Sequence, residues 1–145
     1  MTGRRALRRA SVAAGATIGL GMGLAVGPSV ADELSPWKSF ATNGKSYQNR
    51  SRINYSGAEA RIRRVEGAAP QNTMGVRSRV YYDGGTLCKA STWEYNGMRY
   101  PEGEILFLFV THDCGGLLYG QGNTRTWNGE DYREVPTLKT PMVFE

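Results

Sequence analysis

Histidine and cysteine are scarce in this sequence, and the scarcity excludes several kinds of site. Among 145 residues there are one histidine and two cysteines. A metal site built from several imidazoles, a four-cysteine zinc ribbon and a dense disulfide framework all lack their ligands. The glycine pairs at 84–85 and 115–116 are not followed by the Lys and Ser or Thr of a phosphate-binding loop. We therefore expect no metal and no cofactor.

Helical periodicity is also lacking after Ala31. Apolar and polar residues instead alternate with a period of two over 58–65 and again over 76–82, which predicts strands. Turn signals typical of hairpins lie between such segments: Asp83-Gly84-Gly85, Asn96-Gly97 and Asn128-Gly129. Short strands with glycine-rich turns favour an all-β fold, a small antiparallel sandwich or barrel.

Two later segments add to this prediction. The unbroken apolar run 105–110 predicts a central strand that is buried on both faces, with Phe107 and Phe109 in the core. Residues 117–121 and 124–127 are expected to pair with each other as a further hairpin.

The formal net charge of +5 comes mostly from the first 31 residues, which have the layout of an export signal. Arg4, Arg5, Arg8 and Arg9 precede an uncharged apolar run, and Ser29-Val30-Ala31 supplies small residues for cleavage. Part of a twin-arginine motif is present, so the general and twin-arginine routes both stay open. We predict a signal peptide over 1–31 and a single secreted domain over 32–145. This domain is expected to be extracellular or cell-wall associated, monomeric and without a membrane span.

The predicted mature chain has 14 basic and 13 acidic side chains, but they are unevenly placed. Residues 38–89 hold ten basic and three acidic groups, whereas residues 90–145 hold four and eight. A fold that separates these halves onto two faces creates a site for a polyanion, and a fold that pairs them does not.

The two cysteines, Cys88 and Cys114, are expected to pair, because an exported chain meets an oxidising environment. Closing a loop of this length stabilises a domain by roughly 3–4 kcal/mol. A paired Cys114 has no free thiolate, so its neighbour His112 has no cysteine nucleophile to activate.

The predicted binding residues lie on the segment 76–95. With Val76, Val80 and Tyr82 inward, strand alternation turns Arg77, Arg79 and Tyr81 outward. If Cys88 and Ala90 also point inward, the outward side of the return strand carries Trp93 and Tyr95. Such a basic, aromatic face suits a glycan, a polyanion or a protein. The opposite parity, with both aromatic rings inward, is an equal alternative.

Two other function classes stay open beside a non-enzymatic binding protein. A small secreted ribonuclease would use His112 as the acid, one of Glu94, Glu102 or Glu104 as the base, and Arg77 or Arg79 on the phosphate. A protein inhibitor or toxin-like partner would present a rigid loop, for which Arg99-Tyr100-Pro101 is the candidate.

The chain resembles small uncharacterised exported proteins of Streptomyces-like actinobacteria, the high-GC Gram-positive soil bacteria. The matching features are the Arg-rich, Ala/Gly-rich leader, Trp37, Tyr47-Gln48-Asn49, 75–81, Leu87-Cys88, Trp93-Glu94-Tyr95-Asn96 and Tyr119-Gly120-Gln121-Gly122. The resemblance implies secretion and a compact disulfide-linked domain, and it implies no activity.

Overall fold

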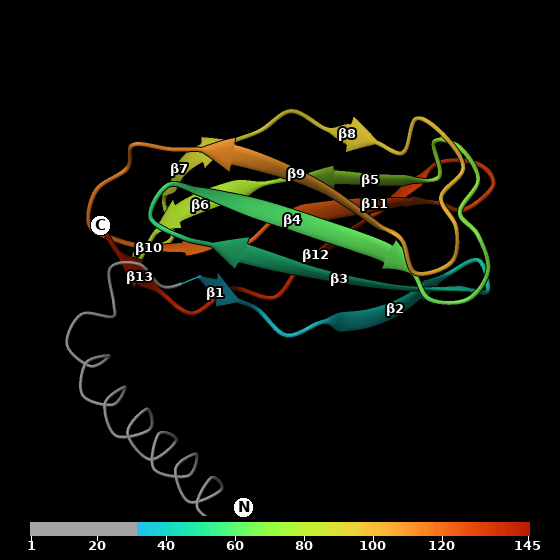
Figure 1. Cartoon of the computed structure of the whole chain (residues 1–145), viewed down its shortest axis with the longest axis horizontal. Coiled ribbons are helices and arrows are strands. Elements are labelled where there is room, and N and C mark those ends of the chain that lie inside the picture. Colours follow the sequence, from blue (N-terminus) through green and yellow to red (C-terminus); the bar gives the residue numbers. More distant parts are fainter. Residues whose placement is uncertain (1–31) are drawn as a thin grey trace, which may run out of the picture.

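A computed structural model describes residues 32–145, and every regular element in them is a β-strand (Figure 1). The predicted signal peptide, 1–31, lies outside the described residues. The strands are β1 (Glu33–Leu34), β2 (Lys38–Thr42), β3 (Lys45–Ile53), β4 (Gly57–Arg64), β5 (Met74–Arg77), β6 (Arg79–Tyr82), β7 (Leu87–Ala90), β8 (Glu94–Tyr95), β9 (Ile105–Thr111), β10 (Leu117–Gly120), β11 (Asn123–Trp127), β12 (Tyr132–Pro136) and β13 (Val143–Phe144).

The first layer is one antiparallel sheet, here called the β3–β4 sheet, with the order β1-β3-β4-β9 and with β2 also paired to β3. The predicted alternation over 58–65 is confirmed in β4. Ala58, Ala60 and Ile62 are buried in the interior, whereas Arg61 and Arg63 lie on the outer face. Period-two patterning thus gives this sheet one apolar and one polar face.

The second layer consists of two four-stranded antiparallel sheets that lie end to end along the sandwich, with their strands interleaved in the sequence (Figure 1). The β6–β10 sheet has the order β13-β10-β6-β7, and the β5–β11 sheet has the order β12-β11-β5-β8. The chain passes from one to the other at Ser78, at 91–93, at 121–122 and at 137–142. The predicted hairpin of 117–121 with 124–127 is therefore wrong, because β10 pairs with β6 and β11 pairs with β5.

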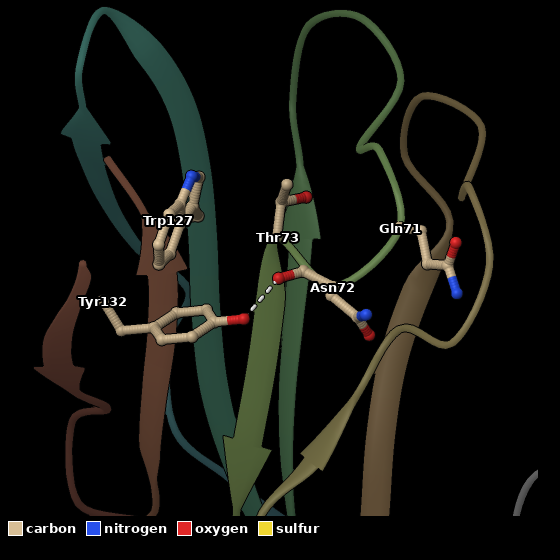
Figure 2. A pocket seen from close by; sticks show the side chains of 5 residues that line it. All are labelled: Gln71, Asn72, Thr73, Trp127 and Tyr132. Atoms are coloured by element: carbon tan, nitrogen blue, oxygen red, sulfur yellow. Dashed lines mark hydrogen bonds between the residues drawn. The ribbon is translucent and has the colours of Figure 1, made fainter. Parts of the chain in front are cut away.

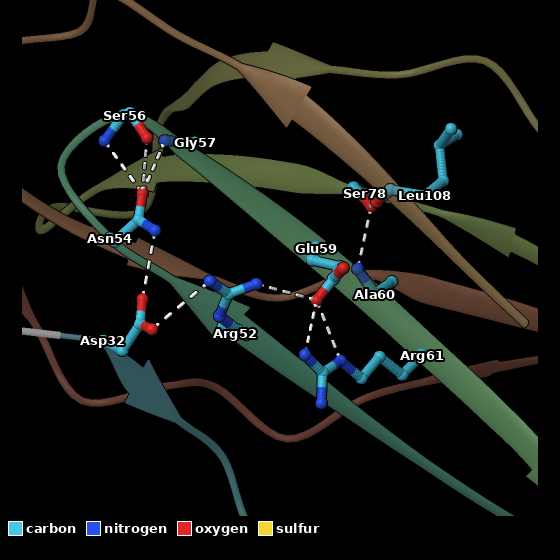
Figure 3. Close-up of polar contacts among 10 residues, drawn as sticks. All are labelled: Asp32, Arg52, Asn54, Ser56, Gly57, Glu59, Ala60, Arg61, Ser78 and Leu108. Atoms are coloured by element: carbon cyan, nitrogen blue, oxygen red, sulfur yellow. Dashed lines mark hydrogen bonds and ion pairs between the residues drawn. The ribbon is translucent and has the colours of Figure 1, made fainter. Parts of the chain in front are cut away.

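Ser78 fastens the first of these crossings to the opposite layer (Figure 3). Its buried hydroxyl donates to the Leu108 carbonyl at 2.5 Å and accepts the Ala60 amide at 2.8 Å. Both partners belong to the β3–β4 sheet, on neighbouring strands. The chain therefore passes between the two small sheets at a buried residue whose hydroxyl group has both a hydrogen-bond donor and an acceptor as partners.

The interior between the layers has two apolar clusters, one under each small sheet. Ile62, Met74 and Val76 lie in the first, and Ile53, Val80 and Leu118 lie in the second. A polar strip runs beside them, where hydroxyl and amide groups bond across the layers: Asn49 to Thr124 at 2.8 Å, Ser51 to Thr137 at 2.6 Å and Thr42 to Thr126 at 2.8 Å. These bonds offset the cost of burying the polar groups.

The predicted disulfide is present. Cys88 in β7 is bonded to Cys114, which follows β9, across a sequence separation of 26. Cys114 lies in the connection from β9, an edge strand of the β3–β4 sheet, to β10, so the bond ties the edge strand β7 to the place where the chain passes between the layers. The all-β antiparallel fold with one disulfide is therefore confirmed.

The prediction for 105–110 is wrong in one respect. This segment forms β9, which is an edge strand and not a central one. Its side chains alternate: Leu106 is buried in the interior, but Phe107 and Phe109 are 54% and 40% exposed on the outer face. An apolar run carries no alternation, so the sequence could not reveal that one face of this strand is uncovered.

Candidate functional site

Four aromatic side chains, Trp93, Tyr95, Tyr132 and Trp127, meet on the outer face of the β5–β11 sheet; we call them the aromatic row. Neighbouring ring centroids are 6.3 Å apart for Trp93 and Tyr95, 5.2 Å for Tyr95 and Tyr132, and 5.0 Å for Tyr132 and Trp127. The rings come from β8, the loop before it, β11 and β12. Contacts at these distances are favourable, so the row is a continuous apolar surface of defined shape.

Gly75 in β5 makes room for the row. It lies directly opposite Tyr95, and a Cβ atom on Gly75 would come within 2.7 Å of the Tyr95 ring. Its neighbours Met74 and Val76 are fully buried, which places Gly75 and Tyr95 on the outer face. The missing side chain thus lets the Tyr95 ring lie against the strand.

Arg125 in β11 holds the row in place. Its guanidinium lies 4.0 Å from the Trp93 ring centroid and donates to the Tyr95 hydroxyl at 2.6 Å. The Glu134 carboxylate is 3.9 Å away and balances the charge. An arginine stacked on one ring and bonded to the next restricts both rings. The Arg125 guanidinium therefore interacts with the row and with Glu134.

The end of the row forms one wall of an open pocket of about 260 Å³ (Figure 2). Trp127 and Tyr132 line it on one side, and Gln71, Asn72 and Thr73 line it on the other. The Tyr132 hydroxyl donates to the Asn72 carbonyl at 2.5 Å. Burial and the nearby Tyr95 raise the pKa of Tyr132, so its hydroxyl keeps its proton and this bond at neutral pH.

Hydrogen bonds to Asn96 hold the loop that carries Asn72. The Asn72 amide donates to the Asn96 carbonyl at 2.7 Å, and Asn72 has a φ of 61°, which asparagine tolerates well. The fully buried Asn96 side chain accepts the Met74 amide at 2.9 Å and donates to the carbonyls of Pro70 and Met98 at 2.7 and 3.1 Å. These bonds position the pocket before any ligand arrives.

The five predicted binding residues are divided between the two sheets of the second layer. Trp93 and Tyr95 belong to the aromatic row, and Arg77 is on the same sheet, where its Nε donates to the Ser91 carbonyl at 3.0 Å. Arg79 and Tyr81 belong to the β6–β10 sheet. There Arg79 donates to the Tyr81 hydroxyl at 3.2 Å, and Tyr81 stacks on Tyr119 at 5.2 Å.

The return strand β7 is irregular. Its pairing passes from Val80 with Lys89 to Tyr81 with Leu87, so Cys88 is left as an extra residue in a bulge. Leu87 and Lys89 are exposed, whereas Cys88 and Ala90 are partly buried. Trp93 and Tyr95 reach the outer surface because the chain leaves β7 and pairs again as β8 in the other sheet.

Sequence reasoning missed Arg125, Trp127 and Tyr132. The alternation of Arg125 and Trp127 with Thr124 and Thr126, which are fully buried, indicates that the first two point outward. It does not indicate which residues lie beside them, because β11 pairs with β5 across more than forty residues of sequence. Only that pairing brings these side chains beside Tyr95.

Two of the three glutamates proposed as the base of a ribonuclease, Glu102 and Glu104, lie far from His112. The His112 side chain is fully buried and faces the Glu145 carboxylate at 3.5 Å and the Asn54 carbonyl at 3.4 Å. Glu102 and Glu104 precede β9 whereas His112 follows it, so about 20 Å of strand separates them. Glu102 instead accepts the Gly67 amide at 2.8 Å.

Within residues 32–145, no group of three or more His, Cys, Asp or Glu side chains is placed to hold a metal ion. The same part of the chain has no helix long and apolar enough to cross a membrane. Comparison with protein-family models, with curated proteins and with solved structures finds no match to this chain.

Proposed function

We propose that this protein is a secreted, non-enzymatic glycan-binding protein, and that the aromatic row and its pocket are the binding site. One observation carries this proposal. The Trp127 and Tyr132 rings form one wall of an open pocket, and Gln71, Asn72 and Thr73 line the other side. Apolar walls with a few well-placed polar groups are typical of small-ligand sites.

The chemistry of a sugar matches this pocket on both sides. A pyranose ring has apolar C–H faces, which pack against aromatic rings, and hydroxyl groups, which bond to amides. Trp127 is 37% exposed, so its ring is open to such a partner. The side chains of Gln71 and Asn72 are exposed at the pocket and are free to donate and accept.

A neutral sugar chain fits this face better than a polyanion. The single guanidinium in the row, that of Arg125, is already occupied by Trp93, Tyr95 and Glu134. The row continues from the pocket over Tyr95 to Trp93, so an extended chain can contact more than one ring. A linear polysaccharide therefore gains contacts that a single sugar lacks.

Export supports the same function. The layout of residues 1–31 matches a signal peptide, and a disulfide such as Cys88–Cys114 is stable in an oxidising compartment. We therefore place the mature protein, as a monomer, outside the cell or at the cell wall, where polysaccharides are available.

The test is the change Trp127→Ala, measured by affinity electrophoresis and calorimetry against a panel of soluble neutral polysaccharides. Because the ring forms one wall of the pocket, we expect binding to weaken by about tenfold or more, equivalent to about 1.4 kcal/mol. The control is Phe144→Ala, which removes an aromatic ring that is 64% exposed elsewhere. Unchanged binding in Trp127→Ala, or no wild-type binding to any member of the panel, would contradict the proposal.

A further inference from the structure

The outer face of the β3–β4 sheet, on the opposite side of the sandwich from the aromatic row, is rich in arginine. Cross-strand pairing arranges its outward side chains in three rows: Gln48, Arg63 and Ile105; Arg50, Arg61 and Phe107; Arg52, Glu59 and Phe109. Four arginines thus share this face with a single glutamate. Neither the predicted binding residues nor the proposed glycan site includes any of them.

The two carboxylates of this face, those of Glu59 and Asp32, lie at one end of it and form ion pairs there (Figure 3). Glu59 is only 5% exposed, accepts hydrogen bonds from Arg52 at 3.1 Å and from Arg61 Nε at 2.8 Å, and forms an ion pair with Arg61 Nη2 at 2.7 Å. Asp32 lies beside them and pairs with Arg52 at 3.3 Å. The carboxylates therefore neutralise the Arg52 end of the face, and they leave the other end positive.

Arg50 is the least compensated of these arginines. It lies directly opposite Arg61, and its buried Nε has no hydrogen-bond partner. Burial lowers the pKa of Arg50, and the charges of Arg61 and Arg63 lower it further. Like charges directly opposite each other destabilise a sheet, so the fold bears a cost here.

Two contacts hold this arrangement together without neutralising it. The guanidiniums of Arg50 and Arg63 lie 4.6 and 4.1 Å from the centroid of the Trp37 ring. Arg63 also donates twice to the Gln48 amide oxygen, at 3.0 and 2.7 Å. Both partners are uncharged, so the positive charge stays available while the guanidinium positions are fixed.

We propose that Arg50 and Arg63, beside Trp37, bind an anionic sugar residue, one that carries a carboxylate or a sulfate group; Arg61 lies next to them but is already paired with Glu59. An oxyanion between the guanidiniums would relieve their mutual repulsion and would accept bidentate hydrogen bonds. Phe107 lies directly opposite Arg61 and is 54% exposed, so it offers a ring to the C–H face of the same sugar.

The size of the positive region favours a sugar over a nucleic acid. Nucleic-acid binding uses a basic track that follows many phosphates. Here only two arginines, Arg50 and Arg63, have no carboxylate partner, and the region ends at Glu59 and Asp32, which would repel a continuing phosphate chain. The region fits one or two anionic groups.

The experiment measures binding of a heparin-derived oligosaccharide and of oligogalacturonate at low ionic strength, for the wild type and for three variants. Arg50→Gln removes the charge at the centre, and we expect binding to weaken by about tenfold. Arg50→Lys keeps the charge but loses the planar fork, so its affinity is expected to lie in between. Arg99→Gln removes an exposed arginine elsewhere and serves as the charge-matched control.

The outcomes separate this site from general electrostatics and from the glycan pocket. Equal losses in Arg50→Gln and Arg99→Gln, or no wild-type binding to either sugar, would overturn the proposal. Tighter binding of a single-stranded oligonucleotide with the same number of charges would overturn the class of ligand. Trp127→Ala should leave anionic binding unchanged, because its ring is on the other face of the sandwich.

Folding of the variant needs its own measurement. Because Arg50→Gln removes a like-charge contact, we expect its unfolding temperature to stay at or above that of the wild type. If that variant does not fold, Arg63→Gln tests the same cluster, and an unchanged affinity for both sugars in Arg63→Gln would overturn the proposal.

Discussion

Replacing Cys88 and Cys114 together by alanine lowers the free energy of unfolding by about 3–4 kcal/mol, the value expected for a loop of this length. The sequence separation is 26, and the bond links the edge strand β7 to the connection between β9 and β10, where the chain passes from one layer to the other. Such a loss is a large part of the net stability of a small domain. Urea unfolding followed by tryptophan fluorescence measures it.

Reduction of the wild type provides the matched control for this prediction. Dithiothreitol should shift the urea midpoint of the wild type to that of the double variant, and it should not shift the double variant itself. Because Cys114 is buried beside Val80 and Leu118, alanine also leaves a small void there, which adds to the loss. A change below about 1 kcal/mol would contradict the prediction.

Gly122→Val lowers the free energy of unfolding by about 3 kcal/mol, the upper end of the usual cost of overpacking. A Cβ atom on Gly122 would lie 2.5 Å from the Ala60 Cβ and 2.6 Å from the Arg77 carbonyl oxygen. These neighbours belong to the opposite layer and to β5, so the second layer has to move away as a whole. The Gly122 amide would also lose its bonds to Ser51 and Thr137, at 2.9 and 3.0 Å.

The matched control for this change is Gly84→Val, where a Cβ atom meets nothing within 4 Å. We expect thermal unfolding of Gly84→Val to stay close to that of the wild type, and Gly122→Val to unfold at a temperature lower by 10 °C or more, by the scale of about 4–8 °C per kcal/mol for domains of this size. Equal unfolding temperatures in the two variants would show that the layers are not in close contact at this crossing.

The two outer faces of the sandwich differ in how their arginines are used. On the β5–β11 sheet, the Arg125 guanidinium contacts the aromatic row and is paired with the Glu134 carboxylate. On the β3–β4 sheet, Arg50 and Arg63 contact only uncharged partners. The uneven charge along the chain therefore becomes a difference between surfaces, and this difference is why the two faces are proposed to bind different sugars.

Much of the local structure could be predicted from the residues. Alternation correctly predicted the interior and exterior sides of β4, and it correctly placed Val76 and Val80 inward, whereas Tyr82, which was expected inward with them, is 37% exposed. Turn residues correctly placed the hairpin of β6 and β7 and that of β11 and β12. The apolar segment of β9 was misjudged, because its exposed Phe107 and Phe109 look like core residues in the sequence.

The candidate sites could be predicted only in part. Trp93 and Tyr95 were found, but Trp127 and Tyr132, which form the pocket with the loop at Asn72, were not. The arginines at 50 and 61 lie on strands joined by a single turn, yet no local signal states that they are directly opposite each other. Register between strands depends on how the whole sheet pairs.

The sequence by itself determined the β class and the disulfide. The period-two pattern and the turns are local properties, and two cysteines allow one pairing. Only the tertiary structure decided which outward side chains share a surface. The aromatic row requires β11 beside β5, and the arginine cluster requires β4 between β3 and β9. The physical reason is that backbone hydrogen bonds and buried contacts over the whole fold join strands that are distant in sequence. The residue pattern of a single segment does not indicate which other strand it will pair with.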